Sequence, residues 1–140
     1  MSYVLFPKSV IDQTLQAPTE PGVRLLEPLK TLALAGKVPF NILEESHMSG
    51  EPEVHLKHAD LWGCLEGEAT FLCGGELVGQ TARINADGSP NENELKGDSI
   101  TGAQETVVGV GDWLWIPAGM PHQHRADTSV RMIIIKIPTV

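Results

Sequence analysis

Residues 53–67, with the sequence EVHLKHADLWGCLEG, decide the fold that we predict for this chain. Glu53 and His55 are two residues apart, so on a β-strand both side chains point to the same face. Asp60 follows after a short link and opens a second apolar run. The stretch therefore predicts two short strands that bring two carboxylates and one imidazole together.

Residues 111–124, with the sequence GDWLWIPAGMPHQH, form the second half of this pattern. An apolar strand is predicted to end near Pro117, because proline cannot donate a hydrogen bond to a sheet. His122 follows just beyond the turn. Two imidazoles and two carboxylates can thus converge from separate strands. This donor set suits a borderline first-row divalent ion such as iron, manganese, nickel, zinc or cobalt.

These two stretches resemble the two motifs of the cupin family. The first family motif reads Gly, five residues, His-x-His, three or four residues, Glu, six residues, Gly. When the motif is aligned on Gly67, His55 matches its second histidine. Asp60 then stands where the family has Glu, and Glu53 stands where the family has the first His. His47 takes the place of the opening Gly.

The second family motif reads Gly, five residues, Pro-x-Gly, two residues, His, three residues, Asn. Ala126 replaces the final Asn, and the resemblance covers residues 38–137. Residues 53–75 also resemble a subgroup of small single-barrel cupins, with Glu-x-His, four residues and Asp followed by Gly-Glu-Ala and Gly-Gly. The other positions of the second motif are all present: Gly111, Pro117, Gly119 and His122.

The resemblance implies an all-β fold, a single double-stranded β-helix (jelly-roll) barrel, over residues 38–140. Residues 1–37 would form a short, partly helical N-terminal cap or arm. The composition agrees with this fold, because 14 Gly and 10 Pro among 140 residues are typical of many short strands joined by turns. A chain of this length is expected to form one domain.

The N-terminal segment shows helical patterns in two places. Leucines at spacings of three, four and seven predict an amphipathic helix over residues 24–35, with Pro28 in its first turn and Gly36 at its end. A shorter helical turn is predicted after Ser9, which would serve as its N-cap. Alternating and apolar runs predict strands elsewhere, separated by hairpins at 67–68 and 74–75: residues 38–45, 53–57, 60–66, 69–73, 113–116 and 129–137.

Two further features of the pattern concern the surface. Residues 79–104 are polar and rich in turn-forming residues, which predicts a surface loop, with a pocket rim as the alternative. The last strand, residues 129–137, is apolar on both faces. We therefore expect the N-terminal segment or a second subunit to cover it or its neighbour, and we expect a homodimer.

Charge and cysteine content exclude several classes of protein. The net charge of −8 argues against nucleic-acid binding, because no basic patch could release counterions from phosphates. No run is long and apolar enough for a signal peptide or a membrane span, so we expect a cytoplasmic protein. Cys64 and Cys73 lack zinc-ribbon spacing and are predicted to be reduced thiols in strands.

Roles for the site residues follow from the resemblance and from strand parity. The resemblance implies metal ligation by His55 and His122. Inside a small barrel, Glu53 and Asp60 would complete the ligand set, since a buried carboxylate needs a partner; for Glu53 the alternative is a cation. Four further residues share these faces: Trp62 and Cys64 as walls of the pocket that would hold a cofactor or substrate, His124 as a supporting group or general acid/base, and Lys57 as a partner for an anionic substrate.

Two functions remain open at this point. The first is a small metalloenzyme, a dioxygenase, isomerase or lyase, in which a divalent transition metal (Fe, Mn, Ni or Zn) acts on a small organic molecule in the barrel. The second is a non-catalytic barrel that binds a sugar or another small ligand, because a fold does not decide a function. A barrel with a degenerate site is a third, weaker possibility.

Overall fold

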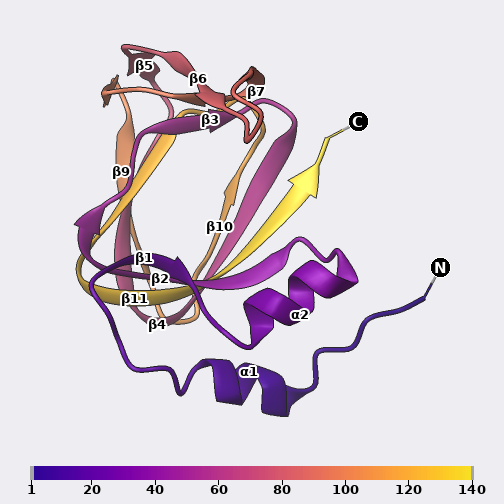
Figure 1. Ribbon diagram of the computed structural model, residues 1–140. Coiled ribbons are helices and arrows are strands. Elements are labelled where there is room, and N and C mark those ends of the chain that lie inside the picture. The colour runs from indigo at the N-terminus through magenta and orange to yellow at the C-terminus, as the bar shows by residue number, and fades with distance from the viewer. Residues whose placement is uncertain (1, 140) are drawn as a thin grey trace.

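A computed structural model describes residues 2–139, which form mostly β-structure (Figure 1). Strands account for 56% and helices for 11% of the chain. No helix among the described residues is both long and apolar enough to cross a membrane. In chain order the elements are α1 (Lys8–Thr14), β1 (Gly22–Leu25), α2 (Leu29–Gly36), β2 (Phe40–Ser49), β3 (Glu53–His55), β4 (His58–Cys73), β5 (Glu76–Val78), β6 (Thr81–Ile84), β7 (Pro90–Lys96), β8 (Ser99–Thr101), β9 (Gln104–Gly109), β10 (Trp113–Ile116) and β11 (His122–Pro138).

Two long strands, β4 and β11, carry the barrel. They pair with each other from one end, where His122 lies opposite Cys73, to the other, where Pro138 lies opposite His58. The free edge of β11 pairs with β2, and the free edge of β4 pairs with β9 and β10. All pairings are antiparallel, and the strands curve around a common interior (Figure 1). The predicted all-β barrel is thereby confirmed.

The register of the short strand β3 places the polar residues of the first motif at one end of the barrel. Glu53 of β3 lies opposite His122 of β11. On its other edge β3 pairs with β7, where His55 lies opposite Glu94. This end of the barrel is the upper end in Figure 1, where β3, β6 and β7 lie together. Three segments that are distant in sequence therefore meet there.

The apolar core has two parts. Inside the barrel, inward residues of β4, β9 and β11 pack around Phe71 and Met132, which are fully buried. A second cluster lies between the N-terminal segment and the outer face of the barrel, where Leu26 and Leu29 pack against Ile42 and Ile133. The N-terminal segment therefore covers the apolar last strand, as one of the two expected arrangements.

The N-terminal segment differs in detail from the prediction. Arg24 and Leu25 belong to β1, which pairs with β2, so the helix predicted over residues 24–35 starts too early. Helix α2 begins only after Pro28, because proline has no backbone N–H for a helix interior and is tolerated only at its start. The prediction of Ser9 as an N-cap is also wrong, since α1 begins at Lys8 with Pro7 at the cap, two residues earlier than predicted.

The predicted hairpin at Gly67 does not exist, because β4 runs without interruption from residue 58 to residue 73. Gly67 has a φ of +74° and lies so close to β11 that a Cβ there would sit 2.0 Å from the carbonyl oxygen of Ser129. The pairing register shifts at this point. The glycine thus permits a close approach between two long strands rather than a chain reversal.

The prediction of a surface loop over residues 79–104 is wrong, because this segment contains β6, β7 and β8. β6 and β7 form a hairpin whose tip includes Gly88. These strands could not be recognised from the sequence, because hydrophobic alternation is weak where both faces of a strand contact water or polar groups. His47, which takes the place of the opening Gly of the first motif, is an exposed residue of β2. Cys64 and Cys73 are free thiols, as predicted.

Candidate metal centre

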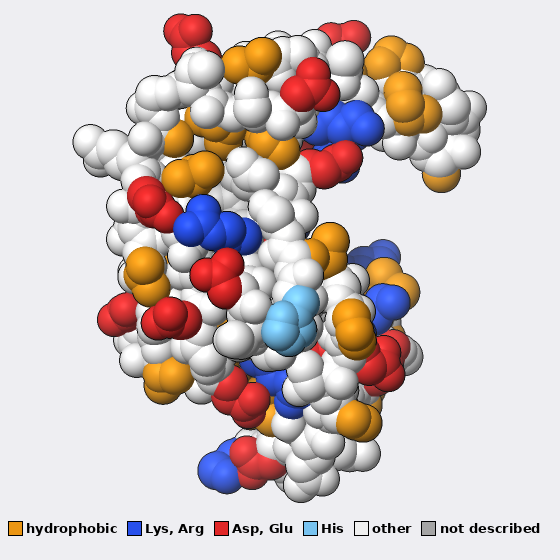
Figure 2. Space-filling view, turned by 90° about the vertical axis from the view of Figure 1, so that its left-hand side faces the viewer, with side chains coloured by type: hydrophobic (Ala, Val, Ile, Leu, Met, Phe, Trp, Pro, Cys, Tyr) orange, Lys and Arg blue, Asp and Glu red, His pale blue; other side chains and the backbone are white. Residues whose placement is uncertain are grey.

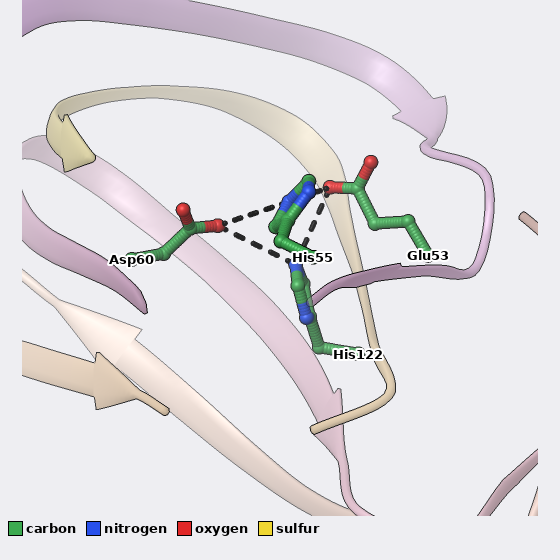
Figure 3. A group of neighbouring side chains, drawn as sticks. All are labelled: Glu53, His55, Asp60 and His122. Carbon is green, nitrogen blue, oxygen red and sulfur yellow. Dashed lines mark ion pairs between the residues drawn. The ribbon is translucent and has the colours of Figure 1, made fainter. Parts of the chain in front are cut away.

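Four side chains converge at the upper end of the barrel, with their polar ends facing one another (Figure 3). The Nε2 atom of His55 lies 3.4 Å from Oε1 of Glu53 and 3.4 Å from Oδ2 of Asp60. The Nε2 atom of His122 lies 3.3 Å and 3.5 Å from the same two oxygens. One ligand atom from each residue lies within 4.8 Å of all the others.

Hydrogen bonds at the far side of each imidazole fix which nitrogen faces the group. Nδ1 of His122 contacts the carbonyl oxygen of Met120 at 3.0 Å. A carbonyl oxygen can only accept, so this nitrogen carries the proton and Nε2 of the neutral ring is left with its lone pair. Nδ1 of His55 donates in the same way to the carboxylate of Glu94. Both lone pairs therefore point at the two carboxylates.

The outer oxygens of the two carboxylates are held by cations. Arg83 of β6 donates to Oε2 of Glu53 at 3.1 Å. Lys136 of β11 donates to Oδ1 of Asp60 at 3.3 Å. Each carboxylate therefore presents a single oxygen to the centre of the group, and its charge is partly balanced from outside.

The centre of the group is chemically incomplete without a cation. The Nε2 atoms of His55 and His122 and Oδ2 of Asp60 are buried and make no hydrogen bond. Buried polar atoms normally find a partner, and two lone pairs facing two carboxylates repel them. A bound ion with bonds of about 2.0–2.2 Å to N and O ligands would satisfy all of these atoms. The residues present therefore fit a divalent metal.

Without a metal, protons take the place of the cation. Burial alone would lower the pKa of His55, but the carboxylates of Asp60 and Glu53 raise it to about 10. The same competition raises the pKa of His122 to about 9. Burial opposes ionisation of Glu53 and Asp60, yet contact with the two histidines holds both carboxyl pKa values well below their usual range.

A second, smaller group adjoins the first through His55 and was missed from the sequence. It consists of His55, His58 and Glu94, whose possible ligand atoms also lie within 4.8 Å of one another. The side chain of His58 is only 16% exposed and stacks on His55 with ring centroids 4.3 Å apart. Glu94 lies in the segment predicted to be a loop, so no pattern in the sequence indicated its contact.

Comparisons with known proteins identify the fold. No protein-family model and no curated protein matches the chain. E. coli YcfD aligns with a TM-score of 0.60 and 16% identity, over 88% of this chain and 35% of that chain. A predicted oxalate decarboxylase from Thermotoga maritima has a TM-score of 0.51 and 13% identity, with 84% and 79% covered. A recombinant oxalate oxidase in complex with glycolate has a TM-score of 0.50 and 17% identity, with 88% and 53% covered.

This chain has the cupin fold. It spans about half the length of the matched oxalate oxidase and about a third of YcfD. Identity at this level shows the fold alone, so the function must be argued from the residues of the site. The predicted resemblance to cupins is confirmed at the level of the fold.

A cavity of about 450 Å³ opens beside the four-residue group of the cupin barrel. Glu53 belongs both to the group and to the cavity wall, and Trp62 and His124 line the same space. Figure 2 shows the molecule hollowed between its upper part, where β6 and β7 lie, and the lower part that carries the helices. Arg83 makes β6 part of the wall, so the segment predicted as a loop or pocket rim does contribute to the pocket.

The other residues predicted for the site lie in different places. Trp62 shares the inward face of β4 with Asp60, as strand parity requires, and is part of the cavity wall. Cys64 continues that face into the apolar core, where its thiol contacts the carbonyl oxygen of Gly67 at 3.3 Å. Lys57 is exposed and outside the wall, because β3 ends at His55 and the alternation is lost.

His124 is held by a residue that the sequence did not point to. Its Nδ1 contacts the carboxylate of Glu45, a fully buried residue of β2. The ring lies among Trp62 and Phe71, with centroids 5.1 Å and 5.3 Å away. His124 therefore stands at the cavity wall as one member of a carboxylate–imidazole pair.

Proposed function

We propose that Glu53, His55, Asp60 and His122 bind a divalent transition metal and that this cupin is a small metalloenzyme acting on an organic molecule in the adjoining cavity. The observation that carries the proposal is the pair of buried, unpartnered Nε2 atoms facing two carboxylates. No set of hydrogen bonds among neutral imidazoles and ionised carboxylates satisfies that arrangement, whereas one cation does.

The donor set limits the choice of metal. Two carboxylates and two neutral imidazoles balance the charge of a divalent ion, and no thiolate takes part, which favours iron, manganese or nickel, with zinc as a further candidate. When bound, such an ion would supply a Lewis acid or, as iron, a site for oxygen chemistry. Dioxygenase, isomerase and lyase reactions are all compatible with these ligands.

The chain's own residues would orient the ligands and handle protons. Glu94 and the Met120 carbonyl keep the two imidazoles in the tautomer that a metal needs. Glu45 holds Nδ1 of His124, which leaves Nε2 of that ring to give or take a proton at a molecule in the cavity. Trp62 supplies an apolar wall that excludes water from part of this space.

Metal content is the first measurement to make. Protein purified without a histidine tag is analysed by mass spectrometry of the metals, together with the variants Glu53→Ala and His122→Ala. We expect about one equivalent of metal in the wild type and loss of at least tenfold in affinity in both variants. His47→Ala, which removes an exposed histidine, is the matched control and is expected to keep the metal.

Two other outcomes are informative. Metal lost only in His122→Ala would remove Glu53 from the ligand set. A wild type that stays free of metal even after reconstitution would contradict the metalloenzyme proposal. The second candidate, a barrel that binds a small molecule such as a sugar without turning it over, would then be the better account of the cavity.

The homodimer and the cytoplasmic location stay predictions. The dimer was expected because the last strand is apolar on both faces, but the N-terminal segment of the same chain packs on that strand. A dimer contact would therefore have to use another surface, such as the exposed Trp113 and Trp115 of β10. Sedimentation at micromolar concentration tests the dimer, and a monomer would contradict it.

A further inference from the structure

Two cations from distant parts of the chain stand on the wall of the cavity beside the proposed metal centre. Arg83 comes from β6 and Lys136 from near the end of β11. The same wall also carries the carboxylates Glu51 and Glu53. The side chains of Arg83 and Lys136 remain 36% and 47% exposed, which leaves donors available to a molecule in the cavity.

The carboxylates that hold these cations are the ones that would hold the metal. Arg83 contacts the outer oxygen of Glu53 at 3.1 Å and also Glu51 at 3.2 Å, and Lys136 contacts the outer oxygen of Asp60 at 3.3 Å. A divalent ion on the inner oxygens would draw charge from both carboxylates. The attraction between each carboxylate and its cation then weakens, and the cations can turn to an anion in the cavity.

The rest of the wall is mostly apolar and comes from other strands. Leu25 of β1, Leu43 of β2, Trp62 of β4 and Ile134 of β11 face the same space. A cavity of about 450 Å³ with such a wall and a few charged groups is typical of sites for small organic ligands. One part of the ligand is thus expected to be charged and the remainder apolar.

We propose that the cavity binds an organic acid, a molecule with one carboxylate and an apolar body. The carboxylate pairs with Arg83 beside Glu53, and the body packs against Leu43, Trp62 and Ile134. Arginine suits this role because its planar N–H groups match the two oxygens of a carboxylate. The inference names the substrate class of the proposed metalloenzyme and rests on that proposal for the place of the metal.

Matched pairs of ligands test the charge requirement directly. Phenylacetate and its neutral amide, phenylacetamide, have the same shape and differ in charge. Their affinities are measured by isothermal titration calorimetry with protein at saturating manganese and with protein treated with a chelator. We expect phenylacetate to bind at least about tenfold more tightly than the amide to the manganese-loaded protein, as a charge-assisted pair requires.

A chain-length series tests the apolar part of the site. Acetate, butanoate and hexanoate are titrated into the same manganese-loaded protein. Each added CH₂ group that leaves water for the cavity wall is expected to raise the affinity about fourfold. An affinity that does not change from acetate to hexanoate would contradict an apolar body packed on Leu43, Trp62 and Ile134.

Variants assign the charge preference to these residues. Arg83→Gln is expected to lower the ratio of acid to amide affinity at least about tenfold, while Arg83→Lys keeps the charge but not the planar N–H groups and retains only part of the ratio. The matched control is Arg125→Gln, which removes an arginine that pairs with Glu105 on the surface and does not line the cavity. Because the readout is a ratio at saturating metal, a change in metal affinity does not alter it, and circular dichroism verifies folding.

The outcomes separate this inference from the proposed function. Equal binding of acid and amide to protein that holds manganese, or no binding of phenylacetate at millimolar concentration, would overturn the inference and leave the metal centre standing. Preference for the acid in protein that binds no metal would overturn the metal centre and keep the anion site. An unchanged ratio in Arg83→Gln would also overturn the assignment to Arg83.

Discussion

At the scale of single residues, the candidate centre depends on what lies behind each ligand. Glu53 occupies the position of a histidine in the family motif, yet Oε1 of its carboxylate lies 3.3 Å from Nε2 of His122. Its outer oxygen is held by Arg83. The presence of a carboxylate at a position where the family motif has an imidazole is thus matched by Arg83 outside the candidate centre, which balances the extra negative charge of Glu53.

The contact between Glu94 and His55 predicts a supporting role for Glu94, which is not one of the four proposed ligands. Glu94→Gln should keep the fold but lower metal affinity about 10–100-fold, because the amide oxygen can still accept from Nδ1 of His55 but lacks the negative charge that raises the basicity of the imidazole. Competition with a fluorescent chelator measures the affinity. Glu92→Gln, on an exposed position of the same strand, is the control and should bind metal like the wild type.

The raised histidine pKa values predict proton release on metal binding. At pH 7.5 the metal-free protein holds protons on His55 and His122, since their pKa values are about 10 and about 9. A metal must displace about two protons there. Calorimetry in buffers of different ionisation enthalpy counts them, and a titration that releases none would contradict the arrangement.

The same pKa values set the sign of the pH effect on stability. A histidine pKa that is higher in the folded than in the unfolded state stabilises the metal-free fold fully below the unfolded value of about 6.5. This stabilisation is lost as the pH rises through about 9 to 10. The metal-free protein is therefore expected to melt at a lower temperature at pH 10 than at pH 8, and the loaded protein should lose less.

At the scale of elements, the close approach of β4 and β11 at Gly67 predicts a large effect of a single methyl group. In Gly67→Ala the new Cβ would meet the backbone oxygen of Ser129 at 2.0 Å, and the residue would also have to keep a φ of +74°. Backbone atoms cannot move aside as a flexible side chain can. We expect a loss of at least about 2 kcal/mol in unfolding free energy, measured by urea titration.

Gly74 offers the matched control for this prediction. It has a similar positive φ of +88°, but a Cβ there would meet no atom within 4 Å. Gly74→Ala should therefore show only the cost of the backbone conformation, about 1 kcal/mol. Equal losses in the two variants would show that the approach of the two strands does not determine the effect.

Elements whose pattern reflects burial were predictable, and elements that tertiary contacts decide were not. The strands around Trp62 and Ile134 were recognised because their apolar residues pack in the core, on one face of the first strand and on both faces of the second. The strand that contains Glu94 was missed because its polar residues face water or the metal centre. Likewise, the sequence around Gly67 is compatible with a hairpin or a continuous strand, and only the partner strand decides between them.

The candidate site divides in the same way. His55, Asp60 and His122 were found because strand parity and motif spacing bring them together, and the structure places them side by side. Their supporting partners were not found, because Arg83 and Glu45 come from segments with no spacing relation to the motifs. Lys57 was assigned to the site by strand parity. Strand β3 ends at His55, two residues before Lys57, so parity does not extend to that residue.

At the scale of the whole molecule, buried ion pairs attach the N-terminal segment to the barrel. Glu44 of β2 is fully buried and accepts hydrogen bonds from Arg131 of β11 and from Arg24 of β1. Arg131 also donates to the backbone oxygen of Leu15. One carboxylate and one guanidinium thus link three segments that lie far apart in sequence. The N-terminal segment is therefore expected to unfold together with the barrel.

Removing the carboxylate of Glu44 tests this linkage. Glu44→Ala leaves buried Arg131 with only the more distant carboxylate of Glu66, 3.9 Å away, and loss of the partner of a buried charge costs about 3–5 kcal/mol. The loss should appear in urea unfolding as one cooperative transition at lower concentration. Glu105→Ala, which breaks the exposed pair with Arg125, is the control and should cost less than about 1 kcal/mol.

Acid provides an independent check on the same pair. Burial would raise the pKa of Glu44, but the hydrogen bonds from Arg24 and Arg131 outweigh it and hold the pKa below its ordinary value. A lowered pKa stabilises the fold above the unfolded value of about 4.3, and this stabilisation is lost as the pH falls through the folded pKa. The difference in stability between wild type and Glu44→Ala should therefore shrink below pH 4. A separate first transition in which the N-terminal segment leaves an intact barrel would contradict the linkage, and protease digestion of the first 37 residues under mild urea would reveal it.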